Sequence, residues 1–219
     1  MNQSTIKKLS LGILATLCCG AVFAGPLKAP SWNHMMIPMR PAQDTITAGG
    51  PIYSNLATDA CTSCNYDASN GYLIIGPTNC YLPGSTQWLA YPFYAARTAV
   101  PRQASVAVTL DADLCSNGAN KFTVAIYDDA CAGPNNLLMS GVATAPAAPC
   151  ALATVRFRTT TSLTAGQKYW IVCSTAAGTQ DSFTGVWWES NYAPFYVNFN
   201  DGNGWQFDAP ASPGGFMIQ

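Results

Sequence analysis

Apolar and polar residues alternate along several segments of the chain, with the period of two that is typical of β-strands with one buried face. The alternation is clearest over residues 104–110, 121–127 and 152–158. Shorter runs, rich in β-branched and aromatic residues and bounded by turn-forming residues, predict further strands at 52–56, 72–75, 87–94, 137–143, 185–190, 195–199, 204–207 and 215–218. No helical period of any length follows the first residues of the chain.

The stretch from Leu163 to Ser174 contains the strongest strand signal. It opens with the turn Thr-Ala-Gly and continues as the uncharged run Tyr-Trp-Ile-Val-Cys at residues 169–173. This run is too short for a buried helix and has no polar position on either face. We therefore expect a central strand that is covered on both faces.

Two local signals refine the strand assignment. Pro92 cannot donate to a strand ladder, which favours a sheet edge or a bulge at that point. The segment Asn200-Asp-Gly-Asn-Gly204 favours a hairpin, because Asp-Gly and Asn-Gly tolerate positive φ angles. Roughly ten short strands with regularly spaced turns predict an all-β fold, either an antiparallel β-sandwich or a jelly roll.

The beginning of the chain is typical of a secretory signal peptide. Lys7 and Lys8 precede an apolar run at residues 9–23, and small residues before and at Ala24 favour cleavage there. The apolar run of about 16 residues is shorter than the roughly 20 that span a bilayer, which favours cleavage over a retained anchor. We expect a signal peptide at 1–24 and no membrane span in the cleaved protein.

The remainder divides into two parts. Residues 25–50 are rich in Pro and Met without a sustained period, which predicts an extended arm or linker. Residues 51–219 form the expected single β-sandwich domain, with enough chain for a sizeable core.

Charge is scarce in this sequence. Charged residues make up 10% of the chain, against roughly a quarter in typical soluble domains. Without the two leader lysines the net charge falls from -1 to about −3. No basic stripe remains, which argues against nucleic acid and anionic membrane surfaces as partners.

The cysteines predict disulfides, because an exported chain folds in an oxidising compartment. Two of the nine, Cys18 and Cys19, leave with the leader. Cys131 and Cys150 are the most credible pair, since each would end a strand and together they would close the Gly/Pro/Ala-rich connection between them, a bridge worth about 3 kcal/mol. Cys80 is expected to join Cys61 or Cys64, Cys115 is left unassigned, and Cys173, inside the central strand, is the expected unpaired thiol.

Three features recur in the order found in a known group of proteins. They are Phe122-Thr-Val-Ala-Ile-Tyr-Asp-Asp followed by Ala132-Gly-Pro-Asn-Asn-Leu-Leu, the Leu163-Thr-Ala-Gly-Gln-Lys-Tyr-Trp-Ile-Val strand, and an aromatic tail ending in Gly-Phe. Residues 85–219 thus resemble the exported bacterial β-sandwich domains of the "choice-of-anchor" type. The resemblance implies a secreted or surface β-sandwich and brings no catalytic residue. The many cysteines, and the lack of a recognisable C-terminal sorting tail, depart from that pattern.

Aromatic residues crowd the last third of the chain and allow two interpretations. The period of two places Phe195, Val197 and Phe199 on one face, as a sandwich core requires, and this interpretation is favoured. Exposed rings would instead stack on sugars. The residues expected in such a platform alternate against the apolar positions: Trp187, Tyr192 and Tyr196.

The sequence contains few residues that could form a catalytic site or a metal site. The only histidine, His34, lies in the predicted arm, so a hydrolytic triad is disfavoured. Glu189, the only glutamate, follows two tryptophans and could serve a glycosidase, but the sequence names no second carboxylate. The favoured interpretation leaves Glu189 in solvent.

The sequence offers no complete metal motif. Cys61 and Cys64 with Cys80 and Cys115 lack the paired spacing of a zinc site. Structural calcium could use side chains near Asp111 and Asp113, Asp128 and Asp129, or Asn200 and Asp201, although each also fits an ordinary turn. No cofactor and no metal site are therefore predicted.

These observations favour a secreted, periplasmic or cell-surface protein without enzymatic activity, acting as a surface, matrix or adhesion module. A carbohydrate-binding module, with a glycan as partner, is the first alternative, and a secreted glycoside hydrolase that uses Glu189 is the second.

Overall fold

The computed structural model describes residues 49–56, 64–110, 119–130, 133–148, 150–175, 180–190 and 195–219; for 195–199 and 207–211 only the backbone is considered. These residues all lie in one compact unit, Arg40–Gln219. Their regular structure is all β, and every strand pair is antiparallel. The predicted fold class is therefore confirmed. The expected leader, and the arm as far as residue 48, lie outside the described residues.

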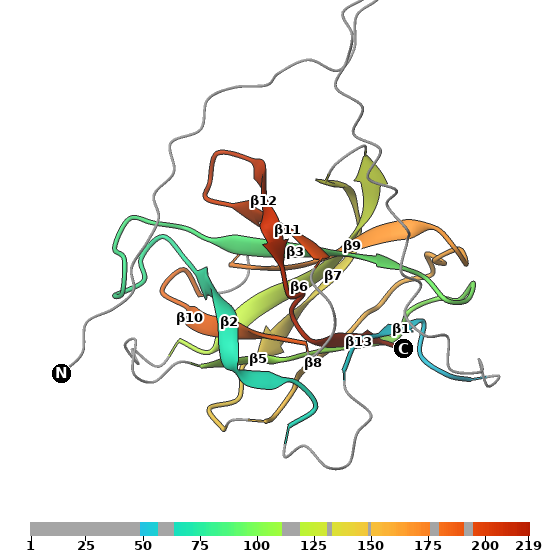
Figure 1. Ribbon diagram of the computed structural model, residues 1–219, viewed down its shortest axis with the longest axis horizontal. Coiled ribbons are helices and arrows are strands. Elements are labelled where there is room, and N and C mark those ends of the chain that lie inside the picture. Colours follow the sequence, from blue (N-terminus) through green and yellow to red (C-terminus); the bar gives the residue numbers. More distant parts are fainter. Residues whose placement is uncertain are drawn as a thin grey trace, which may run out of the picture. The chain divides into compact units, whose positions relative to one another are not determined.

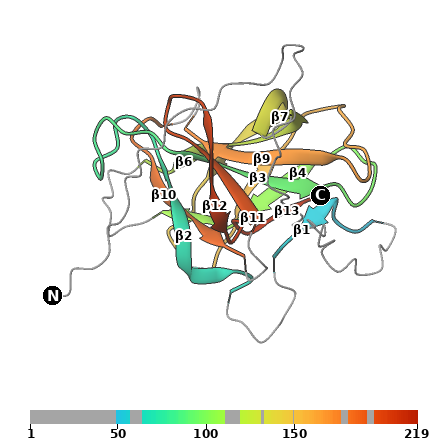
Figure 2. The ribbon, with the colours of Figure 1, turned by 45° about the horizontal axis from the view of Figure 1, so that its top comes forward.

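The strands form two layers that face each other across an apolar core (Figures 1 and 2). One layer is a six-stranded sheet in the order β12-β11-β3-β9-β6-β7. Its strands are β12 (Trp205–Ala211), β11 (Phe195–Asn200), β3 (Trp88–Tyr94), β9 (Lys168–Ser174), β6 (Lys121–Ala130) and β7 (Gly133–Thr144).

The opposite layer combines two smaller sheets, in the orders β1-β13-β4-β8 and β2-β10-β5. Their strands are β1 (Tyr53–Ser54), β13 (Phe216–Ile218), β4 (Gln103–Val106), β8 (Ala153–Arg156), β2 (Asp67–Ile75), β10 (Thr184–Glu189) and β5 (Val108–Leu110).

Strand β9 lies in the middle of the six-stranded sheet, between β3 and β6. Its inward side chains, Tyr169, Ile171 and Cys173, are buried in the main core. Trp170 and Val172 point to the outer face, where they are buried in a second cluster. The prediction of a central strand covered on both faces is confirmed.

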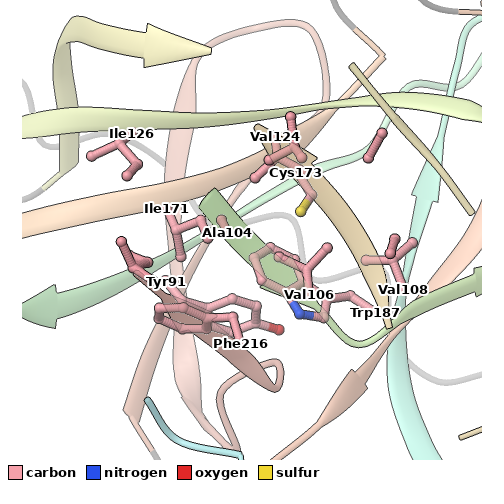
Figure 3. Packing of buried hydrophobic residues seen from close by; sticks show 14 of the residues in the cluster. Tyr91, Ala104, Val106, Val108, Val124, Ile126, Ile171, Cys173, Trp187 and Phe216 are labelled. Carbon is pink, nitrogen blue, oxygen red and sulfur yellow. The ribbon is translucent and has the colours of Figure 1, made fainter. Parts of the chain in front are cut away.

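Aromatic rings from both layers meet in the main core (Figure 3). The indole of Trp187 on β10 packs edge-on against Tyr91 on β3, with ring centroids 4.7 Å apart, and it also contacts Phe216. Its Nε1 donates a hydrogen bond of 3.1 Å to the Gly215 carbonyl. Large rings from the two layers pack against each other here, and the smaller Cys173 side chain is buried in the same cluster.

The predicted single strand at 104–110 is divided in the structure. β4 ends at Val106 and β5 begins at Val108, and the two strands belong to different sheets of the same layer. Ala107 between them accepts a hydrogen bond from Trp188 N and donates one to the Gly215 carbonyl. Alternation along the sequence continues through this point, so the pattern alone could not show that the pairing partner changes.

The structure tests the predictions made from Pro92 and from the turn at residues 200–204. β11 pairs with β3 only over Trp88–Ala90, so β3 has an open edge at Pro92, where no N–H is needed. Between β11 and β12, Gly202 and Gly204 adopt φ angles of 98° and 111°. Both predictions from these turn-forming and strand-breaking residues are confirmed.

The structure corrects one predicted disulfide. Cys150 is bonded to Cys64, 86 residues away in the sequence, and not to Cys131. The expected pair would have joined the two ends of β7, but this strand of 12 residues separates its ends by roughly 40 Å. Cys131 itself lies outside the described residues.

The other cysteines agree with the sequence in part. Cys80 is disulfide-bonded, and Cys64 is not its partner because Cys64 is bonded to Cys150. The alternative pairing with Cys61 stays a prediction, since Cys61 lies outside the described residues. Cys173 is buried and free, as expected.

The Cys64–Cys150 bridge should stabilise the fold by restricting the unfolded chain. The double variant Cys64→Ser/Cys150→Ser is expected to lose about 2–5 kcal/mol of unfolding free energy, as is usual when a bridge closes a long loop. Urea denaturation followed by tryptophan fluorescence measures this loss. Cys173→Ala is the control, because it removes a thiol without opening a bridge. A double variant as stable as the unaltered protein would contradict the prediction.

Candidate functional site

The sequence-predicted platform does not assemble as expected. Trp187 is 0% exposed, so it is a core residue and its assignment to a sugar platform was wrong. The reason is that its face of β10 points between the layers, and a bulge between Trp188 and Glu189 ends the regular alternation. Tyr192 lies outside the described residues. The backbone of Tyr196 lies on β11, opposite Pro210, and its predicted role stays a prediction.

Glu189 lies at the end of β10 and has a neighbour that the sequence did not reveal. Across the bulge its cross-strand partner on β2 is Asp67. Partial burial raises the pKa of Glu189, the hydrogen bond with Ser212 lowers it, and the charge of Asp67 raises it further. The pKa of Asp67 moves the other way, chiefly because Ser69 and then Asn70 donate hydrogen bonds to it.

These two carboxylates have different environments. Asp67 is half-buried, as Glu189 is, but both of its oxygens accept hydrogen bonds within its own turn: Oδ1 from Ser69 N at 2.8 Å and Oδ2 from Asn70 Nδ2 at 2.8 Å. Asp67 therefore stabilises the bulge of β2. Glu189 is half-buried rather than free in solvent, which departs from the favoured sequence interpretation.

The Tyr91 hydroxyl lies fully buried near the same end of β10. Among the described residues it has no hydrogen-bond partner of good geometry. Burial is the main reason that its pKa is well raised, and the charges of Tyr72 and Glu189 act in the same direction, while the nearby Gly214 backbone opposes them slightly. Tyr91 is therefore a neutral phenol at neutral pH.

A polar pocket of about 370 Å³ lies elsewhere, where β6 ends and β9 begins. We call it the β6–β9 end site. It is lined by Asp128, Asp129, Thr164, Gln167, Lys168 and Tyr169. The register brings them together, since Asp128 on β6 is the cross-strand partner of Tyr169 on β9.

The turn before β9 holds one wall of this site. Thr164 N donates a hydrogen bond of 2.9 Å to the Tyr169 hydroxyl, and Ala165 N donates one of 2.9 Å to Thr98 Oγ1. Gly166 has a φ of 77°, a backbone conformation that is unfavourable for residues with a side chain. The Thr-Ala-Gly turn is thus held by backbone and side-chain bonds on both sides.

Charged groups of fixed position form the other wall. Asp129 accepts a hydrogen bond of 2.6 Å from Trp170 Nε1 and forms an ion pair of 3.0 Å with Lys168. The Lys168 ammonium also lies 4.6 Å from the Trp170 ring centroid. The site therefore presents an ordered carboxylate beside an ordered ammonium.

Asp128 adds a second ordered carboxylate. Its oxygens accept hydrogen bonds from Asn136 N at 2.6 Å and from Asn136 Nδ2 at 2.9 Å. These bonds, the side-chain one first, lower the pKa of Asp128, so it is ionised at neutral pH. Free lone pairs remain available to a ligand, because each carboxylate has about four acceptor positions.

An exposed ring lies next to the β6–β9 end site. Tyr94 on β3 is the cross-strand partner of Lys168 and is 51% exposed. Tyr127 and Trp205 pack on the outer cluster farther along the same face. Tyr94 was not identified from the sequence, because only the aromatic residues of the last third of the chain were candidates for a platform. Tyr94 is the last residue of β3.

The described residues supply no group of three or more His, Cys, Asp or Glu side chains that could hold a metal ion. Asn200 and Asp201 use their side-chain oxygens in the β11–β12 turn, where they accept bonds from Gly202 N and Asn203 N. Asp111 and Asp113 lie outside the described ranges. Within those ranges no helix is both long enough and apolar enough to cross a bilayer.

Comparison with known proteins adds no family. No protein-family model matches the chain, and no curated protein matches it. The function is therefore inferred from the geometry of the site.

The environment of Glu189 predicts a pH-dependent effect on stability. Because its folded-state pKa is raised, its stabilising contribution is present below the unfolded pKa of about 4.3 and is lost as the pH rises through the folded pKa. Glu189→Gln should therefore raise Tm more at about pH 7 than at about pH 4. Thermal unfolding followed by circular dichroism measures the difference.

Asp67→Asn is the matched control for this experiment. The pKa of Asp67 is lowered, so its contribution is present above the unfolded pKa and is lost as the pH falls. The control should lower Tm at about pH 7 more than at about pH 4. Two variants with the same pH trend would contradict the assignment.

Proposed function

We propose that this protein is an exported, non-enzymatic β-sandwich that acts as a surface, matrix or adhesion module and binds a neutral carbohydrate at the β6–β9 end site. The observation that carries the proposal is the position of the exposed Tyr94 ring next to a pocket with ordered carboxylate, ammonium and amide groups.

The chemistry of the site fits a sugar. One face of a pyranose is apolar and packs on an aromatic ring, and its edge carries hydroxyls that both donate and accept hydrogen bonds. Asp128 and Asp129 are acceptors, Lys168 is a donor, and Gln167 provides both functions. A pocket of about 370 Å³ also lies within the usual size range of small-molecule sites.

The charges favour a neutral ligand. Lys168 is paired with Asp129, so its charge is largely compensated. Asp128 then leaves the site negative overall. An acidic sugar or a phosphate would meet this negative charge, whereas neutral hydroxyls would gain charge-assisted hydrogen bonds.

Export is the setting that best suits these features. The predicted leader, the scarcity of charged side chains and the Cys64–Cys150 bridge are all usual in proteins of oxidising compartments. The bridge is compatible with an extracellular protein. The likeness to choice-of-anchor domains would add a location on the bacterial surface or in the surrounding medium.

Substitution of Tyr94 tests the proposal. Tyr94→Ala is expected to weaken glycan binding about tenfold or more, because it removes the stacking surface but leaves the polar pocket. A glycan array would identify the ligand, and titration calorimetry would measure the change in affinity. Tyr81→Ala is the control, since Tyr81 is an exposed tyrosine outside the site.

Two outcomes would contradict the proposed site. One is the absence of glycan binding by the unaltered protein. The other is full affinity in Tyr94→Ala together with loss of binding in Tyr192→Ala or Tyr196→Ala, which would favour the platform predicted from the sequence.

A second candidate function, glycoside hydrolysis, is favoured by the position of Asp67 across from Glu189. The pKa values of the two carboxyls are shifted apart, as an acid and an ionised partner require. Under this hypothesis Glu189→Gln would abolish hydrolysis of a glycan while retaining its binding. An unaltered protein that binds the glycan and releases no product would exclude it.

A further inference from the structure

One of the two outer edges of the six-stranded sheet is formed by β7, a strand of 12 residues. Within the described part of the chain β7 pairs only with β6. Strand β8 lies against its inner face, where a Cβ at Gly141 would collide with the Val155 side chain and approach the Arg156 carbonyl to 3.3 Å. The inner face of β7 is therefore covered. Along the edge of β7 that faces away from β6, the backbone groups have no described backbone partner.

The end of the β6–β7 hairpin also extends beyond its neighbour in the sheet (Figure 1). β9 pairs with β6 only over Thr123–Asp128, whereas β7 continues to pair with β6 as far as Ala130. Among the described residues, nothing pairs with the outer edge of β7, and β9 does not extend as far as its first residues.

Edges elsewhere in the sandwich carry features that discourage pairing, and β7 has such features only in its first half. The edge strand β8 is short and includes Arg156, and β12 includes Asp208 and Pro210. β2 has Asp67 and a bulge. β7 contains no charged residue. Its single proline, Pro134, and the two register shifts in its pairing with β6 all lie before Met139, so 139–144 is the regular part of this edge. Long uncharged edges of this kind are templates for another strand.

The solvent side of β7 carries two large apolar side chains beside the polar Asn135, Asn136, Ser140 and Thr144. Leu137 is 54% exposed and Val142 is 48% exposed. Among the described residues they are two of the five exposed large apolar side chains, the others being Tyr81, Leu82 and Tyr94. The strand therefore combines backbone groups that lack a described partner with two apolar side chains, Leu137 and Val142, whose burial would be favourable.

We propose that β7 is a self-association edge, at which two copies of this chain pair antiparallel through β7 about a twofold axis. The sheet would then continue from one copy into the other, with the same strand on both sides of the interface. A twofold arrangement needs only one self-complementary surface. Antiparallel pairing of a strand with its own copy meets that requirement directly.

Charge favours a second copy as the occupant. The net charge of the chain is only -1, so the repulsion between two copies is weak. β7 has no charged residue of its own, and the Asp128 carboxylate that it binds lies near its beginning, at Asn136. Two copies that pair over the rest of the strand therefore bring no charged residues of β7 together. Leu137 and Val142 of each copy would pack against apolar side chains of the same kind. This inference does not depend on the proposed sugar site, although Asp128 of that site accepts hydrogen bonds from Asn136 on β7.

Sedimentation equilibrium of the purified, disulfide-bonded protein tests the proposal. The unaltered protein should be a dimer that dissociates on dilution. Leu137→Lys/Val142→Lys should raise the dimer dissociation constant about tenfold or more, because like charges are placed opposite each other across the strand pair. Leu82→Lys is the matched control: Leu82 is 48% exposed but lies in a loop, and its variant should dimerise normally.

Hydrogen exchange on the unaltered protein gives a second readout that does not depend on a variant. Protection of β7 amides should increase with protein concentration, while that of the opposite edge strand β12 should not. A monomer at all concentrations would overturn the proposal. So would a dimer that is unaffected by the double substitution, or one that protects β12 instead of β7.

Discussion

Burial of β9 on both of its faces is the constraint on which the sandwich depends. The strand is paired on each side, so its backbone polar groups are satisfied by β3 and β6. Its inward side chains enter the main core, and Trp170 and Val172 are covered on the outer face. A strand in this position cannot carry a charge in its middle without a large desolvation cost. The uncharged run at residues 169–173 meets that requirement.

The same strand connects the core to the candidate site. Trp170 closes the outer cluster with its ring, and its Nε1 orients Asp129. Lys168, at the first position of β9, reaches both Asp129 and the Trp170 ring. Residues that stabilise the sheet therefore also fix the charged groups of the β6–β9 end site. A ligand would find these groups already in place, which lowers the entropy cost of binding.

The centre of the six-stranded sheet is buried, whereas its β7 edge is exposed to solvent. At the centre, rings from both layers interlock around Trp187, and the small Cys173 fills the space beside them. At the margin, the outer edge of β7 has no described backbone partner, and Leu137 and Val142 are exposed. The disulfide from Cys64 to Cys150 joins the segment before β2 to the connection after β7. It therefore ties together parts of the sandwich that are far apart in the sequence.

The sequence by itself determined the fold class, most of the strands, the central position of β9, the β11–β12 hairpin and the free thiol of Cys173. These features follow from local rules, namely period, turn chemistry and the absence of charge. Tertiary structure decided which face of β10 is buried, so Trp187 became a core residue. It also decided that Cys64 meets Cys150, that Asp67 lies across from Glu189, and that Tyr94 lies beside Lys168. These are contacts between distant segments, and a pattern that repeats every two residues defines two faces without specifying what either face will meet.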